Sequence, residues 1–230
     1  MKRNSSSDRS GTIRVALFCV VTGCVMALTP GPLVRAADVA QPEATASLDL
    51  LRRAVDPNPT LQSYIAAASL SAGLRTIVPI HETFKGTVYY LKPTRKIIFE
   101  NVPGPLSRFR DLTSTTPTYD QALAEYSIAP LADDGAMSTY SLTPKMQGGR
   151  VTNLTVIVND TSALIEHAVW SYNDGGSLKF DLTYQTIGIF RVPAKDTIAA
   201  RFPGYDVDGV ITFSDYQPNA AVDPSVFTKT

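Results

Sequence analysis

Cysteine is scarce in this chain, and its two copies, Cys19 and Cys24, are confined to the first forty residues. They lie in a segment that opens with basic residues, continues as an apolar run over Val15–Leu28 and ends at the breaker Thr29–Pro32. This order of parts is typical of a secretory signal peptide. Cleavage after Ala36 is expected, so the mature chain would hold no disulfide, thiolate nucleophile or cysteine metal site.

A second processing route stays open, because Val21–Cys24 also fits the loose pattern at which a cysteine is lipidated. Cys24 would then become a membrane-tethered N-terminus. Against this, the apolar run continues through Leu28, where a lipoprotein usually has a polar tether. On the first route the mature protein begins near Ala37 in a bacterial-type periplasm.

Long apolar runs and excess positive charge are also missing. The run Val15–Leu28 has 14 residues, against about 20 for a membrane-spanning helix. The leader holds five of the 21 basic and one of the 21 acidic residues, which leaves 16 basic against 20 acidic groups, a net charge of −4. A nucleic-acid partner is therefore not expected. We divide the chain into a signal peptide (1–36), a flexible lead-in (37–47) and one domain (48–230).

Catalytic and metal-binding motifs are not found in the sequence. The two histidines occur as His81-Glu82 and Glu166-His167, and neighbours on a strand face opposite sides. No nucleophile elbow, phosphate-binding glycine loop or HExxH is present. We therefore expect a protein that is not an enzyme and that has neither a metal nor another cofactor.

The sequence is rich in strand signals from residue 83 onward. Alternating, β-branched and aromatic segments predict strands at 83–91, 95–102, 138–142, 151–158, 164–172, 178–184 and 210–213. Residues 173–176 (NDGG) tolerate positive φ and predict a hairpin turn. The basic, aromatic patch at 89–96 is interpreted as the rim of the sheet.

Helical signals are fewer. Apolar spacing predicts a helix over 48–55, with Ser47 as its N-cap, and a second helix over 118–126. Residues 61–74 carry both alanines and a period-two pattern, and are expected to form a helix that turns into a strand. The fold class is thus mainly β with a few helices.

Apolar stripes alternate with polar residues along most of these strands, as in Leu178–Tyr184. A strongly curved antiparallel sheet would collect the stripes on its concave side. The candidate residues for lining such a cavity are Val88, Tyr90, Ile97, Phe99, Tyr140, Leu142, Leu154, Val156, Trp170, Leu178, Phe180, Leu182, Tyr184, Ile211 and Phe213.

The motifs GTVYYLKPTRK at 86–96 and YSLTPKMQGGRVTNLTVIVND at 140–160, together with the order of the elements, resemble the outer-membrane lipoprotein carrier (LolA-like) family. The resemblance covers most of residues 48–227. It implies an unclosed β half-barrel, lidded by helices, whose apolar cavity accepts acyl chains. The segment between Val102 and Thr118 looks short for the strand hairpin of the carriers, which suggests a more open barrel.

The resemblance also implies a lid latch. The carriers have a basic residue before the motif's proline that holds the lid, and Lys92 occupies this position where the best-known members have arginine. Leu51 is the matching candidate on the lid helix. The implied partners are the acyl chains of a lipid or lipoprotein, an inner-membrane donor and an outer-membrane acceptor, with the protein acting as a monomer. The alternative is a periplasmic sensor or regulatory module on the same half-barrel.

Overall fold

The computed structural model describes residues 42–75, 80–103, 110–146 and 148–228. The expected signal peptide, both cysteines and the first part of the expected lead-in lie outside these residues. The helices are α1 (Pro42–Val55), α2 (Tyr119–Glu125) and α3 (Ser225–Thr228). The strands are β1 (Ser63–Arg75), β2 (Ile80–Leu91), β3 (Thr94–Phe99), β4 (Asp111–Thr115), β5 (Tyr126–Asp133), β6 (Met137–Pro144), β7 (Val151–Asn159), β8 (Leu164–Tyr172), β9 (Ser177–Ile187), β10 (Phe190–Phe202) and β11 (Tyr205–Pro218).

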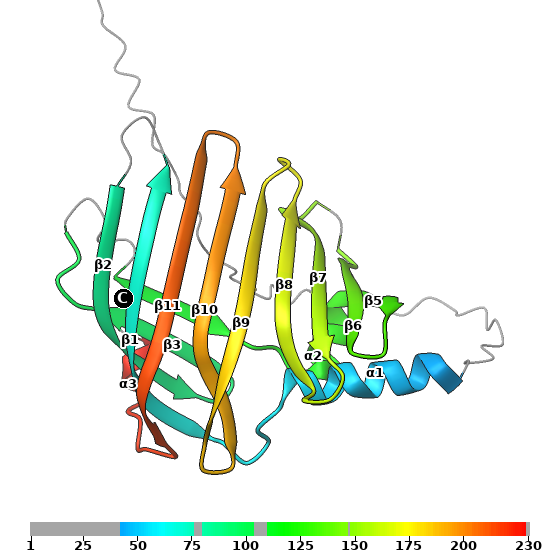
Figure 1. Cartoon of the computed structure of the whole chain (residues 1–230), viewed down its shortest axis with the longest axis horizontal. Helices are drawn as coiled ribbons and strands as arrows, with labels where there is room; N and C mark the ends of the chain where they lie inside the picture. Colours follow the sequence, from blue (N-terminus) through cyan, green and yellow to red (C-terminus); the bar gives the residue numbers. More distant parts are fainter. Residues whose placement is uncertain (1–41, 76–79, 104–109, 147, 229–230) are drawn as a thin grey trace, which may run out of the picture.

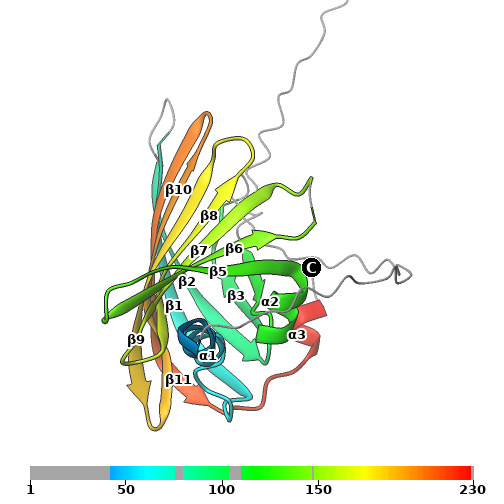
Figure 2. The same ribbon diagram turned by 90° about the vertical axis from the view of Figure 1, so that its right-hand side faces the viewer.

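These strands form one antiparallel sheet of 11 strands in the order β4-β3-β2-β1-β11-β10-β9-β8-β7-β6-β5 (Figure 1). The sheet is strongly curved but not closed, since β4 and β5 are its two edges. Figure 2 shows α1 and α2 on the concave side. The predicted fold class, a mainly β, unclosed half-barrel with a few helices, is confirmed.

Irregular pairing occurs in several strands and contributes to this curvature. Register shifts break the ladders at Ile65/Ala67 in β1, at Pro130/Ala132 in β5 and at Pro193/Lys195 in β10. A bulge bends its strand and increases the local twist. The apolar face of the sheet is therefore concave, and space remains on that side.

The buried side chains form two clusters on the concave face. The larger lies over β1, β2, β3 and β8 to β11, and includes Val88, Phe99, Leu178, Ile198 and Phe213. In the smaller cluster, α1 packs on the β6 and β7 side of the sheet. Its members are Leu50, Leu51, Ala54, Tyr119, Tyr140, Leu142, Val156 and Val158.

Several local predictions are confirmed. The hairpin at 173–176 joins β8 to β9, with Gly175 at φ 79° and the Asp174 carboxylate accepting from the Gly176 backbone N–H. Helix α2 begins after Thr118, whose hydroxyl accepts from the Gln121 N–H. No helix in the described part of the chain is both long and apolar enough to cross a bilayer.

Two predictions at the N-terminal side were wrong. Residues 63–75 form strand β1 without a preceding helix, because both neighbouring strands pair along it and Tyr64, Ala66, Ala68 and Leu70 alternate inward. Helix α1 begins at Pro42, a residue type favoured at the first helical position. Ser47 therefore lies inside the helix and is not its N-cap. The helix also includes residues 42–47 of the expected lead-in.

Candidate functional site

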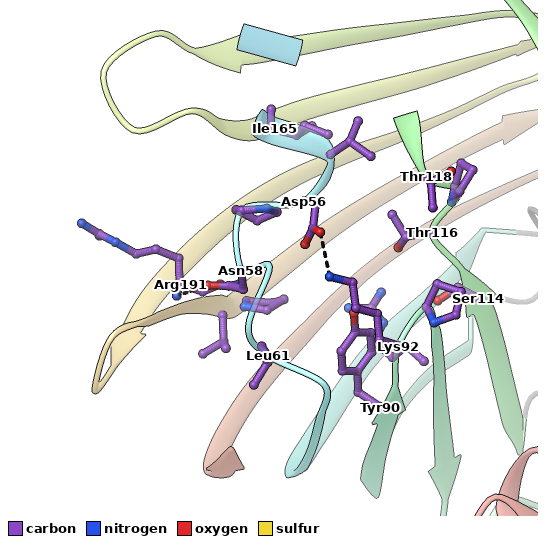
Figure 3. A pocket seen from close by; sticks show the side chains of 18 of the residues that line it. Asp56, Asn58, Leu61, Tyr90, Lys92, Ser114, Thr116, Thr118, Ile165 and Arg191 are labelled. Carbon is purple, nitrogen blue, oxygen red and sulfur yellow. Dashed lines mark hydrogen bonds and ion pairs between the residues drawn. The ribbon is translucent and has the colours of Figure 1, made fainter. Parts of the chain in front are cut away.

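A hollow of about 710 Å³ lies on the concave face, where the segment after α1 crosses in front of the sheet. Its floor comes from β1, β2, β3, β9 and β10, and its far wall from residues 114–120. Figure 3 shows this arrangement, with Tyr90 and Lys92 facing Asp56 and Asn58 across the opening. Apolar side chains on its surface include Ala54, Val55, Leu61, Ile165, Leu182 and Val192.

Residues 56–61, which we call the strap, are held at both sides of the hollow. On one side, the Lys92 ammonium lies 2.7 Å from the Asp56 carboxylate and 3.4 Å from the Pro59 carbonyl oxygen. On the other, the Asn58 amide donates to the Arg191 carbonyl (2.6 Å) and accepts from the Arg191 backbone N–H (2.9 Å). The strap is thus fastened by polar contacts on both sides, and its last residue, Leu61, is buried in the larger cluster.

An ion pair lies deep in the hollow, in a row of otherwise apolar inward positions. Asp196 pairs across the sheet with Ile211 on one side and Leu182 on the other, and is only 1 % exposed. Its Oδ2 lies 3.7 Å from Nη1 of Arg95, whose guanidinium also lies over the Phe213 ring at 5.7 Å. Among the described residues, Oδ1 has no hydrogen-bond partner.

The electrostatics of this pair follow from its burial. Loss of water raises the pKa of Asp196, and the nearby Arg95 charge opposes that rise without cancelling it. The two side chains differ in exposure, 28 % for Arg95 against 2 % for Asp196. Arg95 is therefore the member of the pair that a bound molecule would meet first.

Tyrosines surround the ion pair. Tyr64 stacks on Tyr90 at 4.8 Å and contacts Tyr216 at 5.2 Å. The Tyr184 hydroxyl donates to the Ile165 carbonyl and the Tyr216 hydroxyl to the Pro193 carbonyl. Burial raises the pKa of Tyr64, Tyr184 and Tyr216, and raises that of Tyr90 to about 12. These walls stay neutral at physiological pH.

A second, smaller hollow of about 110 Å³ lies behind the ion pair. Its apolar lining is Ile97, Leu112, Leu178, Phe180, Ile198 and Ile211. Arg95, Ser114 and Asp196 line both hollows. The ion pair therefore stands where the two spaces meet.

The structure distributes the predicted lining residues over the two hollows and the two buried clusters. Tyr90, Leu182 and Tyr184 line the larger hollow, and Ile97, Leu178, Phe180 and Ile211 line the smaller one. The others pack in or against the two clusters: Val88, Phe99, Trp170 and Phe213 in the larger, and Tyr140, Leu142, Leu154 and Val156 in the smaller, together with the lid candidate Leu51.

The interpretation of residues 89–96 as a rim of the sheet was wrong for two side chains. Arg95 faces the hollow, and Lys96, on the opposite face, is 3 % exposed with its ammonium 3.4 Å from Asp111. Lys96 also donates to the Val226 carbonyl, which fastens α3 to the sheet. Strand β3 pairs with β2 on one side and with β4 on the other, so it is not an edge strand of the sheet.

The histidines lie on different strands. His81 is exposed on β2, whereas His167 on β8 lies 2.5 Å from Asp181 on β9. Within the described ranges, no group of three or more His, Cys, Asp or Glu side chains is placed to hold a metal ion.

No family model and no curated protein matches the chain in sequence. Solved structures do match in shape. A domain from Vibrio parahaemolyticus, named as an outer membrane lipoprotein-sorting protein, aligns at 9 % identity with a TM-score of 0.56, covering 80 % of this chain and 97 % of its own. A LolA superfamily protein from Nitrosomonas europaea aligns at 10 % identity with a TM-score of 0.53, covering 80 % and 97 %. The chain has a LolA-like fold.

A DUF1329 family protein from Desulfovibrio piger also aligns, at 14 % identity and a TM-score of 0.49, over 80 % of this chain and 96 % of its own. At these identities the comparisons establish the fold, and the predicted resemblance to LolA-like proteins is confirmed at that level. The site of this chain has to be interpreted from its own residues.

Proposed function

We propose that this protein is a periplasmic carrier that binds the acyl chains of a lipid or lipoprotein in the larger hollow and moves them towards the outer membrane. The observation that carries the proposal is the hollow itself, about 710 Å³ of space left between a curved apolar sheet and a polar-fastened strap. Its size falls within the roughly 300–1,000 Å³ of small-molecule pockets.

The physical chemistry of the walls supports an acyl chain as the occupant. Each methylene that leaves water for an apolar surface gains about 0.8 kcal/mol. Val55, Ile165, Leu182 and neutral tyrosine rings supply such a surface. Binding of this kind requires no catalytic group, and the strap offers a route for release that leaves the sheet intact.

The outer-membrane direction, the monomeric state and the exported location are parts of the same proposal. The exported location is supported by the signal-like leader, and the outer-membrane direction by the shared fold with a domain named for lipoprotein sorting. Gentle purification from the native periplasm followed by native mass spectrometry should show added lipid mass. Acyl transfer between donor and acceptor vesicles should then depend on the protein. A lipid that stays bound and is never transferred would favour the sensor alternative.

Lys92→Ala should speed ligand exchange several-fold while changing stability little. Its ion pair with Asp56 is partly exposed, 28 % and 46 %, and such pairs contribute about 0–1 kcal/mol. It is nevertheless one of the polar contacts that fasten the strap, beside those between Asn58 and Arg191. The measurement is dissociation of a fluorescent fatty-acyl probe, paired with a denaturant melt.

Arg191→Ala is the matched control, because Arg191 holds Asn58 through its backbone and only its side chain would be lost. It lines the same hollow and removes one positive charge, as Lys92→Ala does. Probe dissociation should be close to that of the unmodified protein. Equal acceleration in both variants would show that charge at the opening, and not the strap contact, controls exchange.

A further inference from the structure

The larger hollow borders the smaller one at the Arg95–Asp196 ion pair. Arg95 and Asp196 line both hollows, and the smaller space behind them has an apolar lining from Ile97, Leu178, Phe180 and Ile198. An apolar chain that enters beneath the strap would reach the guanidinium before it reached the second space.

The position of Arg95 is fixed by its surroundings. Asp196, at 1 % exposure, supplies the opposite charge, and the Phe213 ring supports the guanidinium from one side. Arg95 also donates to the Tyr64 hydroxyl. Methylene groups pressed against this pair would displace its remaining water without giving a hydrogen bond in return, which is unfavourable.

We propose that the Arg95–Asp196 pair sets the length of acyl chain that this protein accepts, by closing the smaller hollow to the end of the chain. The inference rests on the proposed function, since it concerns the same hollow. Arg95 acts as the stop, and Asp196 is a positioning residue that keeps the guanidinium in place. The preferred ligand is then a saturated chain that fills only the larger hollow.

The test is a series of saturated fatty acids of increasing length, each used below its micellar concentration to displace a fluorescent fatty-acyl probe from the purified protein. In the unmodified protein the affinity should rise with length and then stop rising. In the double variant Arg95→Ala/Asp196→Ala it should continue to rise by about fourfold for each of the next few methylenes.

Arg95→Met/Asp196→Leu is the matched control, because it removes both charges and keeps side chains of similar length. Because the stop is argued from desolvation of the charges, the limit should move to longer chains in this variant as well. An unchanged limit would overturn the inference, since side-chain volume and not charge would then stop the chain. Adding Leu112→Phe to the double alanine variant should cancel its gain, since Leu112 lies in the smaller hollow on edge strand β4. If the double alanine variant does not fold, Arg95→Ala/Asp196→Leu replaces it, and its affinity should likewise continue to rise with chain length.

The outcomes separate this inference from the proposed function. Absence of probe binding in the unmodified protein would overturn the carrier proposal and the inference with it. Probe binding with the same length profile in the unmodified protein and in the opened variants would overturn the inference alone. The inference would also be overturned if the double alanine variant kept its longer limiting chain length after Leu112→Phe was added. The extra methylenes would then lie outside the smaller hollow.

Discussion

Arg95→Ala is expected to lower the free energy of unfolding by about 3–5 kcal/mol near pH 8, the cost of leaving a buried charge without its partner. Asp196 is 1 % exposed, and its carboxylate lies within 4 Å of a single cation among the described residues. Chemical denaturation at several pH values measures the effect.

The pH dependence gives this prediction its signature. Burial holds the pKa of Asp196 above its ordinary value, and Arg95 is the charge that opposes the rise. Between the ordinary and the raised pKa the folded state binds more protons than the unfolded state, so stability falls as the pH rises through that range. Removing Arg95 raises the pKa of Asp196 further, so this pH range then reaches to higher pH. The difference in free energy of unfolding between Arg95→Ala and the unmodified protein should therefore shrink as the pH is lowered from about 8 to about 5.

Other groups near the pair do not produce this signature. Burial raises the pKa of Tyr64, Tyr90, Tyr184 and Tyr216, so these hydroxyls stay protonated throughout the range. The double variant Arg95→Met/Asp196→Leu is the control, since apolar replacement of a buried pair is neutral or stabilising by about 1–4 kcal/mol. A deficit for Arg95→Ala that stays below 1 kcal/mol, or that does not change with pH, would contradict the prediction.

The sequence predicted the strands whose alternation is regular and missed β4, β5 and β10, of which the last two carry a proline inside the strand. Strand β10 carries Pro193 and β5 carries Pro130, and in both the proline lies at a register shift. Proline normally argues against a central strand and is tolerated at bulges and edges. A bulge cannot be recognised from one sequence, because it depends on which residues the partner strand presents.

The most informative member of the site was missed for a related reason. Asp196 lies on the same face as Ile198, Ala200 and Phe202, which is a period-two pattern with one acid at an inward position. Because β10 was not among the predicted strands, the sequence did not predict that Asp196 points to the concave face. Arg95 was noted, but its partner lies 101 positions away in sequence and only the order of the sheet brings them together.

The predicted lining residues show what alternation alone can and cannot tell. Their alternation assigns them to one face, but it does not say which part of that face remains open. Helix α1 packs against Tyr140, Leu142 and Val156, whereas Leu182 and Tyr184 face open space. The difference comes from where α1 ends and the strap begins, which is a matter of tertiary packing.

Leu182→Glu is expected to weaken binding of a fluorescent fatty-acyl probe by about 5- to 150-fold, from the roughly 1–3 kcal/mol cost of an unpaired buried polar group. Leu182 lines the larger hollow and pairs across the sheet with Asp196. A carboxylate there would face the acyl chain and a second acid at once. Because Leu182 is only partly buried, the protein should still fold, at a cost of about 1–2 kcal/mol.

Thr183→Glu is the matched control, on the same strand with the same added charge. Thr183 is exposed and its neighbours in the strand face the other side of the sheet, so probe affinity should stay within about twofold of the unmodified protein. Phe180→Ala adds a second comparison, since Phe180 lies behind the ion pair in the smaller hollow. If the stop at Arg95 holds, shortening Phe180 should leave the affinity for a chain that fills only the larger hollow almost unchanged. Equal loss of affinity in Leu182→Glu and Thr183→Glu would place the acyl chain somewhere other than the concave face.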